Sequence, residues 1–199
     1  MKRFINLILI IVITSPLYAD FKVMAGINLS KYNNHELNDF QSSHKFGFLG
    51  GIGFEKKITQ NLLLEFDLLY FQKGSKAESI DPPYFESKYD LDVTSIPILL
   101  RYQFLYGSSP YILAGFELSF INSHKKITEG QETIDIKGST DSSDWGYLFG
   151  CGYQIELEED LFLFIEARWH QGDRNISKDV AGLPIIHTNT ILILVGVRS

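Results

Sequence analysis

The stretch WGYLFGCGYQIELEEDLFLFIEARWHQG, residues 145–172, decides the fold. Two runs rich in aromatic and aliphatic residues flank an acidic turn at residues 158–160, and nearly every second residue in each run is glycine or charged. Because successive side chains of a strand point to opposite faces, this alternation is typical of β-strands. The stretch therefore predicts two strands joined by a tight turn, each with one apolar and one polar face.

The same period of two runs through six further segments, so we expect eight strands. Short and long links alternate between them, which predicts an all-β, up-and-down antiparallel barrel with tight turns at one rim and extended loops at the other. Proline cannot donate a ladder hydrogen bond, so Pro97 predicts a bulge in the fourth segment. The short links lie near residues 57–60, 106–110 and 158–160, and the long links span 31–44, 74–89, 122–143 and 172–187.

The positions of the charges predict which face points inward. A charged side chain on the lipid face costs roughly 2 to 4 kcal/mol near the bilayer midplane, and the charges here lie opposite the large apolar residues. We therefore expect a transmembrane barrel with apolar residues facing lipid and an ionic network filling the lumen. The predicted network consists of Glu65, Asp67, Arg101, Glu117, Glu166, Arg168 and Arg198.

Aromatic residues near the strand ends predict the two membrane interfaces, where such side chains gather. We expect Tyr102 and Phe104 at the short-turn rim, and Trp145, Tyr147 and Trp169 at the loop rim. A soluble sandwich or lipocalin-like barrel is the main alternative, because it would show the same alternation while burying the apolar face.

The N-terminus reads as a cleavable secretory signal peptide. Lys2 and Arg3 precede a short apolar run, and Ala19 is a suitable cleavage position. The run is shorter than the about 20 apolar residues that a spanning helix needs. We expect a signal peptide at residues 1–19 and an outer-membrane barrel domain at residues 20–199, with a retained N-terminal anchor as the alternative.

Composition and motifs argue against several other classes of function. The net charge of −6 offers no basic surface for nucleic acid, and the single cysteine, Cys151, excludes an internal disulfide. The sequence contains no nucleotide-binding loop, no Cys/His cluster with metal spacing and no nucleophile elbow. We therefore expect no cofactor, no metal and no enzymatic activity.

Five segments resemble the outer-membrane β-barrel, porin-like family common in Bacteroidota, over almost the whole mature chain. The resemblance implies an outer-membrane location, surrounding lipid and lipopolysaccharide, and the barrel-assembly machinery as a partner. Such barrels usually end on an aromatic residue, whereas this sequence ends Val197, Arg198, Ser199. The segments are LLLEFDLLYFQKG (62–74), SIPILLRYQF (95–104), PYILAGFELSF (110–120), DWGYLFGCGYQIEL (144–157) and FIEARWHQGDRNI (164–176).

Two stretches suggest activities beyond the barrel itself. EARWHQGDRNIS loosely resembles a motif of outer-membrane lipid A deacylases, but no serine follows His170 at the expected spacing, so we interpret His170 as a lumen-facing rim residue. The loop HKKITEGQETIDIKGSTDSSD, residues 124–144, is either a recognition surface for an extracellular ligand or a solvated spacer. We predict a structural or surface-interaction role, with a narrow ion channel and a lipid-modifying enzyme as alternatives.

Overall fold

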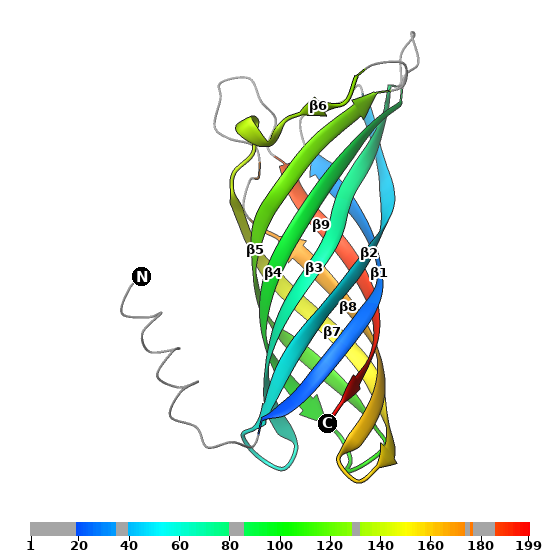
Figure 1. Cartoon of the computed structure of the whole chain (residues 1–199), viewed down its shortest axis with the longest axis vertical. Helices are drawn as coiled ribbons and strands as arrows, with labels where there is room; N and C mark the ends of the chain where they lie inside the picture. The colour runs from blue at the N-terminus through cyan, green and yellow to red at the C-terminus, as the bar shows by residue number, and fades with distance from the viewer. Residues whose placement is uncertain (1–18, 35–39, 80–85, 129–131, 174–175, 177–185) are drawn as a thin grey trace, which may run out of the picture.

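The computed structural model describes residues 19–34, 40–79, 86–128, 132–173, 176 and 186–199. Eight strands pair antiparallel, each with the next along the chain, and β1 pairs with β9 to close a barrel (Figure 1). The predicted eight-stranded up-and-down barrel is confirmed. The strands are β1 (Asp20–Asn34), β2 (Phe40–Lys57), β3 (Leu62–Ser79), β4 (Glu86–Gln103), β5 (Ser109–Thr128), β7 (Ser143–Glu158), β8 (Leu161–Gly172) and β9 (Ile186–Arg198).

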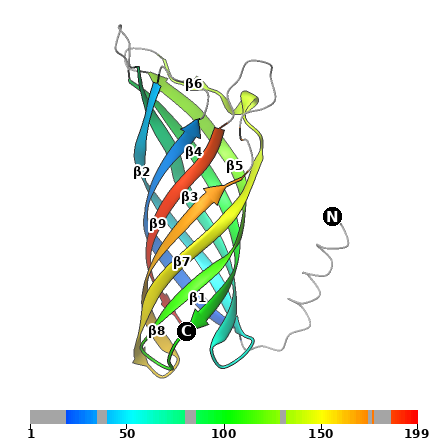
Figure 2. The same cartoon turned by 180° about the vertical axis from the view of Figure 1, so that it is seen from behind.

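Two small elements lie outside the barrel wall, between β5 and β7. The two-residue strand β6 (Ile134–Asp135) pairs with Lys125 and Lys126 of β5, and the short 3-10 helix η1 (Lys137–Ser139) follows it. Figure 2 shows both at the end of the barrel opposite the tight turns. The described residues contain no helix long and apolar enough to cross a bilayer.

Side chains alternate between the two faces of the wall as the sequence predicts. On β3, Leu68 and Tyr70 are 46% and 50% exposed on the outer face, whereas Asp67 and Leu69 are 3% and 0% exposed in the lumen. On β5, Phe116 and Leu118 point outward while Glu117 is fully buried. The apolar residues therefore form the outer surface and the charges lie inside, the reverse of a soluble barrel.

The strands are longer than predicted at the loop end. Strand β5 continues to Thr128 and β3 continues to Ser79, into segments that the sequence predicted as loop. Alternation fades in these extensions because polar residues occupy both faces, yet the backbone ladders between β3, β4 and β5 continue. The prediction that residues 122–128 belong to a loop is therefore wrong.

The predicted bulge at Pro97 is also wrong. Pro97 faces Glu117 of β5 in regular register, and the shift in the pairing of these strands lies at Asp92 and Val93. On its other side, β4 keeps one register with β3 before and after Pro97, because Phe66 pairs with Ile98 and Leu69 with Ser95. The barrel wall thus accommodates Pro97, which has no backbone N–H group, without the extra residue of a β-bulge.

Candidate functional site in the barrel lumen

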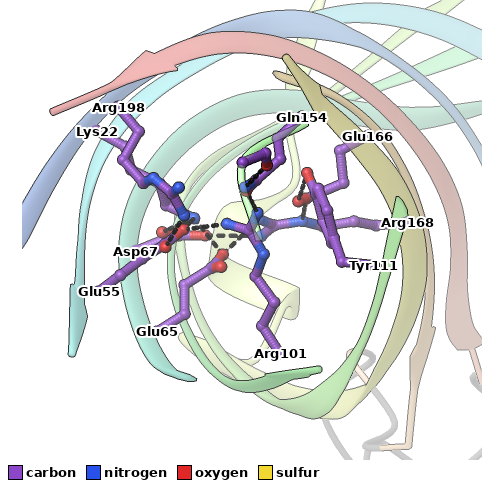
Figure 3. Close-up of polar contacts among 11 residues, drawn as sticks. Lys22, Glu55, Glu65, Asp67, Arg101, Tyr111, Gln154, Glu166, Arg168 and Arg198 are labelled. Atoms are coloured by element: carbon purple, nitrogen blue, oxygen red, sulfur yellow. Dashed lines mark hydrogen bonds and ion pairs between the residues drawn. The ribbon is translucent and has the colours of Figure 1, made fainter. Parts of the chain in front are cut away.

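Figure 3 shows an ionic network that crosses the lumen. Its residues lie near the strand ends that the tight turns connect. At its centre, Arg168 of β8 donates from Nη1 to Asp67 Oδ2 and from Nη2 to Glu65 Oε1, both at 2.7 Å. Its Nε also donates to Glu166 on the same strand. One guanidinium therefore joins three carboxylates from the facing strands β3 and β8.

A fourth carboxylate, Glu55 near the end of β2, joins three further cations to this network. Glu55 accepts hydrogen bonds from Nη1 of Arg101 and Nη1 of Arg198, both at 2.7 Å. The ammonium group of Lys22 lies 3.8 Å from Glu55 Oε1 and 2.9 Å from Asp67 Oδ1, and it also pairs with Glu65. We call Lys22, Glu55, Glu65, Asp67, Arg101, Glu166, Arg168 and Arg198 the short-turn network.

Two neutral residues attach the network to the barrel wall and to a tight turn. The Tyr111 hydroxyl donates to Glu166 Oε2 at 2.9 Å, and the Arg101 guanidinium lies 3.7 Å from the centre of the Tyr111 ring. Gln154 accepts a hydrogen bond from Arg101 and donates to the carbonyl oxygen of Gly107 at 2.6 Å. Gly107 has a φ of 66°, a left-handed conformation that favours glycine in the β4–β5 turn.

Charges within the short-turn network cancel. Four cations face four carboxylates, and every one of these residues is at most 4% exposed. Buried ions are costly unless they are paired and hydrogen-bonded, and here each has an ionic partner within the network. The lumen is consequently filled by side chains at this level.

Glu117 lies apart from the six other residues of the predicted network. Its Oε1 accepts hydrogen bonds from Ser119 Oγ at 2.7 Å and from Lys73 Nζ at 3.3 Å. The same ammonium group lies 3.5 Å from Nδ1 of His170. We call Lys73, Glu117, Ser119 and His170 the mid-lumen cluster.

Apolar side chains fill much of the lumen toward the loops. Leu91, Val93 and Ile121 are at most 4% exposed and pack with Phe71 and with Ile176, which comes from the segment between β8 and β9. The backbone N–H of Asp141 donates to the Ile176 carbonyl oxygen at 2.9 Å, so residues from two connections meet above the lumen. We call Tyr32, Phe71, Leu91, Val93, Ile121 and Ile176 the loop-end core.

A chain of hydrogen bonds closes the loop-end core. The Tyr32 hydroxyl lies 3.0 Å from His124 Nε2, His124 Nδ1 lies 2.7 Å from Thr140 Oγ1, and that hydroxyl donates to the Ile136 carbonyl oxygen at 2.9 Å. His124 lies above the outward apolar residues of β5, which end at Phe120. Burial lowers the pKa of His124 to about 4, which favours a neutral imidazole in this chain of bonds.

The aromatic residues predicted at the interfaces all lie on the outer face, 37% to 49% exposed. Tyr102 and Phe104 meet edge to face at 5.3 Å where β4 runs into its tight turn. Trp145 and Tyr147 meet at 5.6 Å near the start of β7, and Trp169 stacks on Phe149. Cys151 lies on the same outer face.

Comparison with known proteins identifies the family. A family model described as "Outer membrane protein beta-barrel domain" matches residues 14–176. The chain belongs to this family. Its place in the outer membrane follows from that membership, while the prediction of a Bacteroidota type stays a prediction. No curated protein matches the chain.

Solved structures of outer-membrane barrels share the fold at low identity. The outer membrane protein OprG from Pseudomonas aeruginosa is 12% identical with a TM-score of 0.55, and the match covers 90% of this chain and 94% of that one. Neisserial surface protein A is 16% identical with a TM-score of 0.48, over 89% of this chain and 95% of the other. At these identities the likeness to OprG supports the barrel alone.

Within this outer-membrane barrel, the lumen contains functional candidates that the sequence did not single out. Lys22 and Glu55 belong to the short-turn network and Lys73 belongs to the mid-lumen cluster, although the predicted network omitted all three. Apolar residues in the inward register, such as Leu69 and Leu91, were also missed. Their signal lies in runs such as LLLEFDLLYF, residues 62–71, where leucine occupies both faces.

His170 lies in the buried, inward register of β8, on the opposite side of the barrel wall from the lipid-facing residues. Its side chain is fully buried in the lumen, two residues before β8 ends, with Lys73 and Glu117 as neighbours. No group of three or more His, Cys, Asp or Glu among the described residues is placed to hold a metal ion. The predicted signal peptide falls almost entirely outside the described part of the chain and stays a prediction.

Proposed function

We propose that this protein is a closed structural barrel of the outer membrane that acts through its extracellular end rather than as a channel. The observation that carries the proposal is the short-turn network, in which eight charged side chains at most 4% exposed join facing strands across the lumen. An eight-stranded barrel has an interior just wide enough for side chains. The loop-end core adds a second, apolar obstruction further along the lumen.

Conductance in planar bilayers tests the closed lumen. We expect the wild-type protein to give no steady current steps at low voltage, because ions would have to displace paired charges and then packed leucines. The same preparation should migrate differently on gels before and after boiling, which verifies that folded barrel was inserted. Steady, ion-selective steps from such a preparation would establish the channel alternative instead.

The outer surface supports a lipid-embedded role. We propose that Tyr102 and Phe104 lie at one membrane interface and that Trp145, Tyr147 and Trp169 lie at the other, with lipid and lipopolysaccharide around the apolar band between them. Amphipathic rings favour the headgroup level of a bilayer. We further expect the barrel-assembly machinery to insert the chain, and we expect neither a cofactor nor catalysis.

A surface-interaction role would use the connection between β5 and β7. Asp135 and Lys137 are exposed there, as is Lys125 near the end of β5, whereas His124 and Thr140 are buried in the hydrogen-bond chain that closes the loop-end core. A deletion of residues 124–142 would therefore damage the barrel itself. Replacing residues 132–139 with a short glycine-serine linker removes exposed residues while keeping both buried ones.

Cell adherence tests this role. Cells that display the linker variant should adhere less to a cultured cell monolayer than cells that display the wild type, at equal surface amounts. The matched control is a double Lys→Gln variant at Lys56 and Lys57, exposed residues at the opposite, short-turn end, which should adhere like the wild type. Equal adherence of the linker variant would reject the role.

A further inference from the structure

A short segment between β5 and β7 lies against the loop end of the barrel with few apolar contacts of its own. It contains β6 and η1, and we call residues 134–142 the loop-end cap. Ile134 is 51% exposed, and no residue of η1 is buried. Thr140, 6% exposed, is the one buried residue of the cap. Because few apolar contacts stabilise it, the cap depends on its hydrogen bonds to the barrel.

His124 of β5 makes two of these hydrogen bonds. The backbone N–H of Ile136 donates to the His124 carbonyl oxygen at 2.9 Å, and His124 Nδ1 lies 2.7 Å from Thr140 Oγ1. Ile136 comes directly before η1 and Thr140 directly after it. One residue of the barrel wall therefore binds both ends of η1, while β6 adds its two-residue pairing with β5.

The hydrogen bonds around His124 run in one direction. The Thr140 hydroxyl donates its proton to the Ile136 carbonyl oxygen at 2.9 Å, so Thr140 Oγ1 must accept from an N–H group at Nδ1 of His124. A neutral ring with its proton on Nδ1 has a free lone pair on Nε2. That lone pair accepts the Tyr32 hydroxyl proton over 3.0 Å. The neutral imidazole thus connects β1 to the cap.

A second proton on the ring would disrupt this chain at Tyr32. A protonated histidine donates from both nitrogens, so Nε2 would present a proton to the Tyr32 hydroxyl oxygen, and the hydroxyl would need another acceptor. Tyr32 is 7% exposed, and among the described residues its hydroxyl bonds only to His124. His124 is itself 4% exposed, and a buried charge is costly without a partner. Movement of the charged ring toward water would break its bond to Thr140.

The groups that face His124 give an added proton little support. The rings of Tyr32 and Tyr89 lie 6.0 and 6.2 Å from the imidazole, centre to centre, and neither carries an acidic group that would pair with imidazolium. Lys126 extends over Tyr89 at 5.9 Å and adds positive charge nearby. Asp135 of the cap favours the proton, but it is exposed, so water and salt screen its charge.

We propose that His124 is an acid-sensitive switch that binds the loop-end cap while its ring is neutral and releases the cap when the ring is protonated. Release would expose Tyr32 at the loop end and leave the short-turn network in place, so the barrel would stay folded and filled. Burial lowers the pKa of His124 to about 4, below its ordinary value of 6.5. The closed cap is therefore favoured above about pH 7 and weakens as the pH falls toward about 4. This switch would exist whether or not the barrel has a surface role.

Hydrogen exchange of the whole protein in detergent tests the switch. After correction for the intrinsic effect of pH, backbone exchange in residues 134–142 should be about 30-fold faster at about pH 5 than at about pH 7.5, because the open cap binds the proton more tightly. Residues 161–172 of β8 should stay equally protected at both pH values, which distinguishes release of the cap from unfolding of the barrel. Equal protection of the cap at both pH values would overturn the proposal.

Two variants and one spectrum complete the test. His124→Gln cannot gain a proton, so its cap should exchange at the same corrected rate at both pH values, however stable that cap is. His44→Gln removes an exposed histidine of β2 and should respond to pH like the wild type. Nitrogen-15 NMR of the wild type at neutral pH should show the ring proton of His124 on Nδ1. A pH response that persists in His124→Gln, or a ring proton on Nε2, would contradict the switch.

Discussion

The two ends of the lumen are filled by different chemistry, although the same eight strands line both. At the short-turn end, eight charges pair with one another, and removing one leaves its partners buried and unpaired. At the loop end, leucine, valine and isoleucine pack as in a soluble core, closed by a short chain of neutral hydrogen bonds. The short-turn end thus depends on matched charges, whereas the loop end depends on filled volume.

The largest effect should come from breaking the short-turn network at its centre. Arg168→Met leaves Glu65, Asp67 and Glu166 without their shared guanidinium. Losing one partner of a buried ion pair costs about 3 to 5 kcal/mol, so we expect a loss of that size in unfolding free energy. Urea unfolding in lipid vesicles, followed by tryptophan fluorescence, measures it. A loss below about 1 kcal/mol would mean that water already enters this end.

Truncating a side chain in the loop-end core should have a somewhat smaller effect. Leu91 is 1% exposed, and Leu91→Ala removes packed volume without stranding a charge. Such truncations cost about 2 to 5 kcal/mol, according to how far the cavity collapses. The outward-facing Leu100→Ala is the matched control and should cost less, because lipid fills the space that is left. Equal losses at both positions would argue against a packed loop-end core.

Acid should weaken the loop end through His124. Its folded pKa is about 4, below the ordinary value of 6.5, because burial opposes the charge. The unfolded chain therefore binds the proton first, so this contribution is complete above about pH 7 and is lost between about pH 6.5 and pH 4, by roughly 2 to 3 kcal/mol. Urea unfolding across this range should give a shallower loss for His124→Gln. Parallel curves for the two proteins would contradict this assignment.

The smallest effects should come from removing one hydroxyl at each end. Tyr111→Phe deletes a hydrogen bond to the charged Glu166, and bonds of that kind contribute about 1.5 to 3 kcal/mol. Tyr32→Phe deletes a hydrogen bond to neutral His124, for which about 1 kcal/mol is expected. Both are read from the same urea unfolding experiment. A larger loss in unfolding free energy for Tyr32→Phe than for Tyr111→Phe would contradict the difference between the two ends.

The alternation in the sequence predicted which side chains point outward and which point into the lumen, because this direction depends only on a period of two along each strand. It did not predict which inward residues would meet, since their height along the lumen depends on the stagger of the strands around the barrel. Arg168 and Asp67 lie 101 residues apart and bond directly, whereas Glu117 lies in another cluster. The loop-end core was missed for a related reason. Leucines such as Leu91 lie on the inward face of the wall, which the sequence predicted to be polar or charged.

Matched charges in the short-turn network determine how the barrel responds to an electric field. Displacing one elementary charge through 100 mV changes its energy by about 2.3 kcal/mol, so a lumen filled by charges of one sign would be pulled along the field. Four positive and four negative side chains give opposing forces that sum to zero. A potential across the outer membrane can therefore polarise the network but cannot drive it out of the lumen.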